Sequence, residues 1–340
     1  MTSIKEVAKA ANVSVSVVSK ALNDYPDIKP ETKERILQIA EEMNYSPNLA
    51  GRNLSSKKQM NIGLISSAVF NSSEKDTNAY QVIKGIYRGV EDNNHELSVF
   101  LIDSKKQKQK SYAQFCRERN IGGAILQGLR MDDPYFKELV DTNIPCVYID
   151  HITDEKSENI GSISIDNYAA GIEMTDHLLE RGHREIVVIG GVEETFVNAK
   201  RLEGARESFR KHGIPLPEES IIHANFDEDQ AYREATELLK KRQPTAFLCF
   251  SDLMAYGIMK AVKEAGLTIP EDVSVIGFDD LPFSAITNPP LTTINQNFFD
   301  IGNEAAQLLV KVMEKKQSSQ HVMVNHELVE RGSVRDIHKR

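Results

Sequence analysis

The sequence contains no long apolar run, which excludes the common kind of membrane protein. No window of the 340 residues approaches the roughly 18 consecutive apolar residues that a membrane-spanning helix needs. Met1 leads directly into a polar, helix-forming stretch, so we expect no signal peptide. The length predicts two domains and up to three compact units. A composition of 40% hydrophobic and 27% charged residues is typical of a globular protein with a sizeable core.

Cysteine is scarce, and its placement argues against both a disulfide framework and a metal cluster. Cys116, Cys146 and Cys249 are odd in number and far apart, which fits a reducing cytoplasm. Catalytic motifs are also missing, because there is no G-x-x-x-x-G-K-[ST] loop, no G-x-S-x-G elbow and no H-E-x-x-H pair. Asp279 and Asp280 are adjacent, but neighbours at a strand end generally point to different sides and do not chelate a metal easily. We therefore expect no enzyme, no cofactor and no metal site.

Basic residues outnumber acidic ones only at the start of the chain. The net charge is −9, yet residues 1–58 carry nine Lys or Arg and seven Asp or Glu, whereas the rest carries 32 basic and 43 acidic residues. This asymmetry indicates that only the head of the protein meets a polyanion.

Residues 12–23, NVSVSVVSKALN, open with the alternation of a strand, but their surroundings favour a helix. Ser3 and Glu6 form an S-x-x-E capping box that starts a first helix directly after Ser3. Asn12 suits a tight turn, and Ser14 is a good N-cap for a second helix. A strand at this point would leave the apolar face of the first helix without a partner.

A third helix is predicted from Pro30, a residue favoured in a first turn, to about Asn44. The helical reading directs Val18, Ala21 and Leu22 inward, and it directs Ser16, Ser19 and Lys20 outward. Two short helices joined by a turn and closed by a third are typical of a helix-turn-helix unit, whose second helix enters the major groove of DNA. A purely structural three-helix unit is the alternative.

The segment IKEVAKAANVSVSVVSKALN, together with YSPNLAGRNLSSKK, resembles the headpiece and hinge of the lac repressor/galactose repressor family, and the resemblance covers nearly the whole chain. It implies that Val15, Ser16 and Lys20 read base edges. It also implies that Leu54 wedges into a minor-groove step at the centre of a palindrome. The positions that match DNA contacts in the family are Ser3, Ile4, Ser14, Val15, Ser16, Ser19, Lys20, Asn23, Asn48, Arg52, Leu54 and Lys57.

Two positions depart from the pattern of the family. Lys20 stands where Arg is usual, so a bidentate guanine contact becomes a point-charge contact. Gly51 lies in the hinge where Ala is common, and it costs about 1 kcal/mol of helix propensity. A hinge that folds only on DNA is therefore more costly to order in this chain.

After the head, short β-branched runs alternate with amphipathic segments. The strand candidates are NIGLISS, ELSVFLI, GGAILQG, IPCVYID, GSISID, EIVVIGG, TAFLCFS and VSVIGFD. Such βα repeats predict a doubly wound α/β fold with helices on both faces of parallel sheets. The resemblance further implies two lobes like those of periplasmic sugar-binding proteins.

We therefore expect two domains in this order. Residues 1–58 form the helix-turn-helix headpiece with its hinge at 47–57, and residues 59–340 form an effector-binding and dimerisation domain. The expected segments of this second domain are about 60–160 plus 291–320 for the N-lobe, and about 161–290 plus 321–335 for the C-lobe.

Polar residues gather at the carboxyl ends of the predicted strands, where ligands bind in such folds. The resemblance implies that an effector cleft is lined by Ser67, Gln127, Asp150, Arg201, Phe226, Ser251, Asp279, Gln296 and Phe298. This set suits a polyol, because carboxylates and amides pair with hydroxyl groups, a guanidinium donates several hydrogen bonds, and aromatic faces stack on a sugar ring.

For some of these residues, a structural role is the alternative to ligand contact. Arg201 would then be a surface ion-pair partner, and Phe226 would be a core residue. Asp252 and Asp280 are candidates for helix caps, and we favour Asp279 over them as the ligand contact.

Other residues near the predicted cleft have different expected roles. Asp166 and Asn167 are expected to hold the start of a helix, and His183 is expected to pack or bond near a strand. The stretch AVFNSSEKDTNAYQ after the first strand departs from the family, which leaves Phe70 and Tyr80 as further contact candidates.

The predicted function is a ligand-responsive transcriptional repressor of carbohydrate-use genes in the bacterial cytoplasm, associated with the nucleoid. Its expected partners are double-stranded operator DNA, a sugar or sugar phosphate effector and a second copy of the chain, with no membrane partner. The end of the chain, ELVERGSVRDIHKR, has no heptad repeat, so we expect a dimer rather than a tetramer. The alternatives are a regulator that gains DNA affinity from a protein or phosphorylated corepressor, and a sugar-binding protein without a regulatory role.

Overall fold

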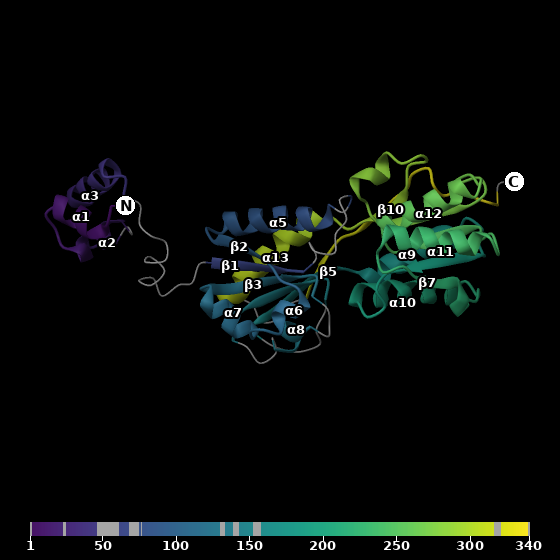
Figure 1. Ribbon diagram of the computed structural model, residues 1–340, viewed down its shortest axis with the longest axis horizontal. Coiled ribbons are helices and arrows are strands. Elements are labelled where there is room, and N and C mark those ends of the chain that lie inside the picture. The colour runs from purple at the N-terminus through teal and green to yellow at the C-terminus, as the bar shows by residue number, and fades with distance from the viewer. Residues whose placement is uncertain are drawn as a thin grey trace. The chain divides into compact units, whose positions relative to one another are not determined.

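The computed structural model describes residues 2–22, 25–45, 61–67, 75, 77–129, 133–138, 143–151, 158–315 and 321–338. The chain divides into two compact units, Met1–Met60 and Asn61–Arg340 (Figure 1).

The first unit is a three-helix headpiece. Its helices are α1 (Ile4–Ala10), α2 (Val15–Leu22) and α3 (Pro30–Glu42). The helical reading of the Val-Ser repeat is therefore confirmed. The core of the headpiece consists of Val7, Ala8, Ala11, Val18, Ala21, Ile36 and Ala40.

Local sequence explains where these helices begin and end. The predicted capping box is present, since the amide of Glu6 donates to Ser3 Oγ at 3.4 Å and the amide of Ser3 donates to the Glu6 carboxylate at 2.7 Å. Asn12 has a φ of 52° and makes the turn before α2. Asn44 has a φ of 49°, and this left-handed conformation ends α3 slightly earlier than predicted.

The second unit contains two six-stranded sheets. The first sheet has the order β11-β5-β4-β3-β1-β2, and all its pairings are parallel. Its strands are β1 (Asn61–Ser66), β2 (Glu96–Leu101), β3 (Ile121–Gln127), β4 (Cys146–Ile149), β5 (Ile160–Ile165) and β11 (His321–Val324).

Helices cover both faces of this first sheet (Figure 1). They are α5 (Asn78–Asp92) and α13 (Phe298–Met313) on one face, and α6 (Ser104–Gln107), α7 (Tyr112–Glu118) and α8 (Pro134–Glu138) on the other. Successive strand residues alternate between the two faces. Leu64 packs with Val82 and Ile86 of α5, whereas its neighbour Ile65 packs with Phe115 of α7.

The second sheet has the order β12-β10-β9-β8-β6-β7, in which only β12 is antiparallel to its neighbour. Its strands are β6 (Ile186–Gly190), β7 (Ile221–His223), β8 (Ala246–Cys249), β9 (Ser274–Asp279), β10 (Thr292–Asn295) and β12 (Glu327–Val329). The helices of this lobe are α9 (Asn167–Leu179), α10 (Phe196–Lys211), α11 (Glu228–Leu239) and α12 (Asp252–Glu264), with the 3-10 turns η3 (Glu218–Ser220) and η4 (Pro282–Ala285).

The chain exchanges lobes after β5, after β10 and after β11, and this corrects the predicted lobe segments. The first sheet contains all of β5 and also β11, although residues 161–165 and 321–324 were expected in the C-lobe. The second sheet contains β10, although residues 292–295 were expected in the N-lobe. The physical reason is edge pairing: β11 adds to β5 and β12 adds to β10, so each lobe is completed by a short strand from the end of the chain.

Candidate functional site

None of the described residues that were matched to a DNA contact is fully buried in the headpiece. Ser3, Ser14 and Ser16 are exposed, and Ile4, Ser19 and Lys20 are partly exposed. Val15 is 39% exposed at the first position of α2. More than a third of this apolar side chain stays exposed in the headpiece, which is consistent with a partner surface. The predicted contacts Asn23, Asn48, Arg52, Leu54 and Lys57, together with the hinge at 47–57, lie outside the described residues.

Lys20 has an acidic partner within the headpiece. Its Nζ donates to the carboxylate of Asp27 in an ion pair whose two side chains are both about half exposed. The hydrogen bond from Lys20 lowers the pKa of Asp27, so Asp27 is ionised at neutral pH. The cation that was matched to base reading is therefore paired with a carboxylate in the headpiece.

A cavity of about 600 Å³ lies at the carboxyl ends of both sheets. It takes lining residues from the strand ends and helix starts of the two lobes, as expected for a doubly wound fold. Eight of the nine residues matched to an effector cleft come together there: Gln127, Asp150, Arg201, Phe226, Ser251, Asp279, Gln296 and Phe298.

Of the other candidates, the two that the structure describes do not line this cavity. Ser67 does not line the cavity. Its hydroxyl donates to the carbonyl of Gly128, and Gly128 is a lining residue. Tyr80 is 64% exposed on α5, and the lining positions of that helix are Asn78, Ala79 and Val82 instead. Phe70 lies outside the described residues.

Arg201 is a buried cation in the cavity wall rather than a surface ion-pair partner, since it is only 4% exposed. Its Nε donates to Asn167 Oδ1 at 2.8 Å, its Nη1 donates to the carbonyl of Phe250 at 2.7 Å, and its Cζ lies 3.6 Å from the centre of the Phe278 ring. Burial lowers the pKa of Arg201 to about 10, against the raising effect of Asp279 and Asp150. The guanidinium is therefore charged at neutral pH, and it is fixed in direction by two of its five donors.

Two carboxylates flank this guanidinium. Asp150 Oδ1 accepts from Ser164 Oγ at 3.1 Å, and Asp279 Oδ1 accepts from Gln296 Nε2. Burial raises the pKa of Asp150, while Arg201 and Ser164 oppose that shift. Oxygens of Asp150 and Asp279, together with the Arg201 donors, form an alternating set of acceptors and donors of the kind that pairs with hydroxyl groups.

Four lining residues other than glycine have a positive φ. The φ of Asp150 is 61°, that of Asn225 is 55°, that of Phe226 is 60°, and that of Asp279 is 118°. Such conformations are costly for side chains with a Cβ and gather at ligand sites. The ring of Phe226 also lies against Gly191, where an added Cβ would meet Phe226 Cζ at 2.0 Å.

Aromatic residues line the cavity beyond those that the sequence indicated. His151 and Phe196 were not expected there, yet both line it, and their rings are 5.3 Å apart in an edge-to-face arrangement. Burial lowers the pKa of His151, so its imidazole is neutral at neutral pH. The position of His151 directly after Asp150 at a strand end was a signal that the sequence offered.

The aspartates next to the lining residues have structural roles. Ser251 Oγ accepts from the amide of Met254 and caps α12. Asp252 is fully buried and accepts from the Leu281 amide and the Ser284 and Thr293 hydroxyls, which ties α12 to η4 and β10. Burial raises the pKa of Asp252 to about 7, against these three hydrogen bonds.

Three further expectations concerned residues outside the cavity. Asp280 does not cap a helix, since it pairs with Arg331 at 2.6 Å. Asp166 caps α9 as expected, and Asn167 has the added task of orienting Arg201. His183 is buried, and its Nε2 bonds to the carbonyl of Arg335 at 3.1 Å.

One ion pair joins the two lobes beside the cavity. Lys75, shortly before α5, pairs at 2.6 Å with Glu228, the first residue of α11. Asp227 lines the cavity directly before this position, so the ion pair stands close to the ligand space.

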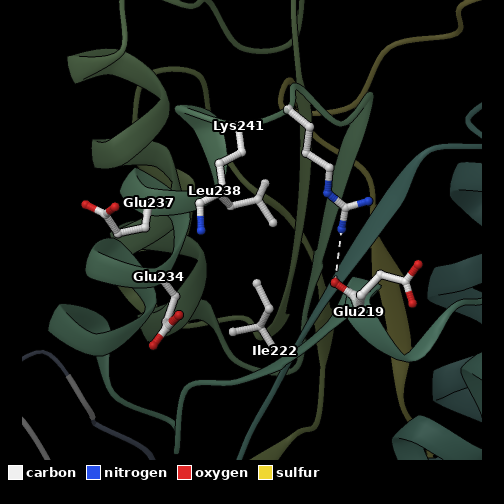
Figure 2. Close-up of a pocket in the computed structure, with 7 residues that line it drawn as sticks. Glu219, Ile222, Glu234, Glu237, Leu238 and Lys241 are labelled. Carbon is white, nitrogen blue, oxygen red and sulfur yellow. Dashed lines mark hydrogen bonds between the residues drawn. The ribbon is translucent and has the colours of Figure 1, made fainter.

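A second cavity, of about 470 Å³, lies at the other end of the second sheet (Figure 2). It is lined by Glu219, Ile222, Glu234, Glu237, Leu238, Lys241 and Arg242. The Arg242 guanidinium donates to the Glu219 carbonyl and to Ser220 Oγ, both at 3.1 Å. These residues stand at the start of β7 and the end of α11, away from the strand ends where ligands bind in this fold class.

The part of the chain that the structure describes contains no group of three His, Cys, Asp or Glu side chains suited to a metal ion. No described helix combines the length and the apolar character needed to cross a membrane. The three cysteines are buried and free.

A helix-turn-helix unit followed by a two-lobed fold with a ligand-sized cavity defines the class of ligand-sensing transcriptional regulators. Residues 3–48 match the model of bacterial regulatory proteins of the lacI family, and residues 175–334 match that of the periplasmic binding protein-like domain. The chain belongs to the lacI family, and it is a DNA-binding transcriptional repressor with a periplasmic-binding-protein-like effector domain.

Full-length relatives support this assignment. The probable helix-turn-helix transcriptional repressor ExuR of Bacillus subtilis is 32% identical over 98% of this chain and 99% of its own length. The repressor PurR of Klebsiella pneumoniae is 32% identical over 99% of this chain and 98% of its own. The crystal structure of the Lac repressor dimer bound to operator and the anti-inducer ONPF has a TM-score of 0.84 at 24% identity, covering 98% of this chain and 99% of that one. The predicted fold class is confirmed by these matches.

Proposed function

We propose that this repressor acts in the bacterial cytoplasm as a homodimer on a palindromic operator, and that a sugar or sugar derivative in the interlobe cavity changes its affinity for DNA. The observation that carries the proposal is the cavity wall itself. It combines a buried, oriented guanidinium with two carboxylates and aromatic rings. That set pairs with the hydroxyl groups and the C–H face of a sugar.

The proposed reading of DNA uses the first turn of α2. Val15, Ser16 and Lys20 face base edges in the major groove, while Ser14 and Ser19 contact phosphates. The exposed γ-methyl groups of Val15 suit the methyl group of thymine, and the Lys20 ammonium suits guanine acceptors. Leu54 of the hinge is proposed to wedge into the minor groove at the centre of the site.

The proposed switch is a change in the relative pose of the two lobes. A ligand that contacts both lobes closes the cavity and moves the N-lobes of the dimer, to which the hinges are attached. The ligand must bind the two states differently, and the operator must then change the affinity for the ligand by the same factor. A protein or phosphorylated corepressor that raises DNA affinity through the same movement is the second candidate.

The proposed dimer surface is apolar and lies on the N-lobe. Tyr80 and Tyr87 are seven residues apart on α5 and are 64% and 55% exposed. Val99 and Leu101 of the edge strand β2 are 45% and 39% exposed. They share a strand face with Leu97, which packs into the core that α5 covers. A large exposed apolar surface on one side of the lobe favours a second copy as its partner.

The test is selection from a fluorescent library of palindromic DNA at fixed salt, with and without a panel of sugars. Fixed salt is needed because phosphate contacts make the affinity steeply dependent on ionic strength. We expect one palindrome to be enriched and one sugar to change its affinity.

Two results would contradict the proposal. One is that no palindrome is enriched above nonspecific binding. The other is that a Leu54→Ala variant binds the selected palindrome as tightly as the parent, because the wedge would then play no part. A protein without residues 1–58 that keeps every biological activity would favour a sugar-binding protein without a regulatory role.

A further inference from the structure

The interlobe cavity has two chemically distinct ends, and this narrows the class of ligand. The inference rests on the proposed function of the cavity as an effector site. Its polar end holds Asp150, Arg201, Asp279 and Gln296, which are joined to one another or to their supports by hydrogen bonds.

The second end is formed by His151 from the N-lobe and by Phe196 from the C-lobe. The His151 ring is held edge-on by Phe136 at 4.4 Å and by Tyr148 at 5.8 Å between ring centres. It meets the Phe196 ring at 5.3 Å, so this pair bridges the two lobes. Both rings line the cavity and both are only partly buried, so apolar ring surface faces the ligand space.

Helix α10 sets the distance between the two ends. Phe196 is its first residue and Arg201 follows five positions later, which corresponds to about 7.5 Å along the helix axis. Val197 and Thr195 line the wall beside Phe196. A cavity of about 600 Å³ is larger than a single sugar ring fills, and it lies within the roughly 300–1,000 Å³ of sites that enclose larger ligands.

The charges and hydrogen-bond acceptors of the lining indicate an uncharged ligand that donates hydrogen bonds. Among the described lining residues the carboxylates are Asp150, Asp227 and Asp279, and Arg201 is the single Lys or Arg. A phosphate or carboxylate on the ligand would add like charge to this set. Gln296 is 2% exposed and its Oε1 accepts no hydrogen bond, although its Nε2 is engaged by Asp279. A ligand hydroxyl that donates to this oxygen would remove the cost of burying it unpaired.

We propose that the effector is an uncharged glycoside with two rings. One pyranose ring occupies the polar end, where its hydroxyl groups bind Asp150, Arg201, Asp279 and Gln296. A second ring, from a disaccharide or an aromatic aglycone, lies against Phe196 and His151. The second ring contacts both lobes and therefore favours their closed arrangement.

The test is calorimetric titration of the full-length protein without DNA. The probes are matched methyl and phenyl β-glycosides of glucose, galactose and xylose, together with cellobiose, lactose and maltose, and with glucose 6-phosphate and glucuronate as anions. We expect one two-ring probe to bind at least about tenfold more tightly than the methyl glycoside of its own sugar, and neither anion to compete.

Phe196→Ala separates the two ends. It should weaken the two-ring probe by about tenfold and leave the methyl glycoside nearly unchanged, because the ring that it removes contacts only the second ring of the ligand. Tyr232→Ala is the matched control, since it removes a partly buried aromatic ring of α11 that lies outside the cavity lining. Thermal melting of both variants verifies that they are folded.

Three outcomes would overturn the inference: tighter binding of an anion than of any neutral probe, an equal loss of methyl and two-ring probes in Phe196→Ala, or binding of no sugar at all. Because the titration contains no DNA, each of these is distinct from a failure to select a palindrome. Selective two-ring binding without palindrome selection would leave this inference standing and contradict the proposed role in DNA binding.

Discussion

Among single residues, Lys20 connects the sequence to DNA recognition most directly. Its ammonium is paired with Asp27 in the free headpiece, and both groups have access to water. A guanine or a phosphate would draw on the same ammonium group. Asp27 therefore competes with DNA for the same cation, and it also repels the phosphate backbone.

Replacing Asp27 with Asn should tighten DNA binding a few-fold, on both specific and nonspecific sites, because Lys20 no longer leaves an anionic partner. Fluorescence anisotropy at several salt concentrations measures this effect. Glu41→Gln is the control, since it removes the same charge from an exposed site on α3. Equal tightening in both variants would mean that net charge alone is responsible, and weaker binding of Asp27→Asn would mean that the pair holds Lys20 in its reading position.

The sequence was informative about residues whose roles follow from their type and place. Arg201 and Asp279 carry the charged groups that the sequence analysis expected to pair with ligand hydroxyls, and the structure brings both to one cavity. Phe196 was missed because nothing in its local sequence distinguishes a cavity-lining ring from a core ring, whereas His151 follows Asp150 at a strand end and was overlooked there. The side chain of Ser67 has an ordinary partner, the Gly128 carbonyl, which depends on a strand pairing that the sequence does not reveal.

Among the elements, helix pairs of the second unit are held together through glycines. On α5, a Cβ added at Gly85 would lie 2.0 Å from the carbonyl oxygen of Phe299, and on α13 a Cβ added at Gly302 would lie 2.1 Å from that of Val82. Contacts this short show that the two helix backbones meet directly. Both helices also pack on the first sheet.

Gly85→Ala should destabilise the protein by about 1–3 kcal/mol or more, because an added methyl group forces the two backbones apart. Urea unfolding monitored by circular dichroism gives this free energy. Gly332→Ala is the control, because an added Cβ there meets nothing closer than 3.5 Å. A loss of stability no greater than that of the control would show that α5 and α13 can shift without cost.

Element types were predicted well, whereas their assignment to lobes was not. Runs such as GGAILQG and EIVVIGG are buried on both faces and read clearly as parallel strands. The strands β11 and β12 are short and only partly buried, so their sequences carry a weak pattern. Which sheet each joins depends on edge pairing with β5 and β10, and a long-range pairing of this kind has no local signature.

For the whole molecule, the apolar surface of the N-lobe predicts the oligomeric state. Tyr87→Asp should convert the dimer to a monomer in sedimentation velocity and reduce affinity for a palindrome far more than for an isolated half-site, since two headpieces no longer bind together. Met323→Asp is the control, because Met323 is 51% exposed on the opposite edge of the same sheet.

Either of two results would contradict the predicted assembly. One is a Tyr87→Asp variant that remains dimeric, which would place the interface on another surface. The other is a parent protein that sediments as a stable tetramer.

The order of the strands along the chain also determines when each part of the protein can finish folding during synthesis. The headpiece has all the residues of its core once residue 40 has left the ribosome. The N-lobe begins at β1 but waits for α13 and β11, which are made near the end of the chain. Until then the apolar side of β3, β4 and β5 lacks its second covering helix. A message that stops before Phe298 therefore yields a finished headpiece on an unfinished lobe, a product that proteases should remove before it can occupy DNA without responding to a ligand.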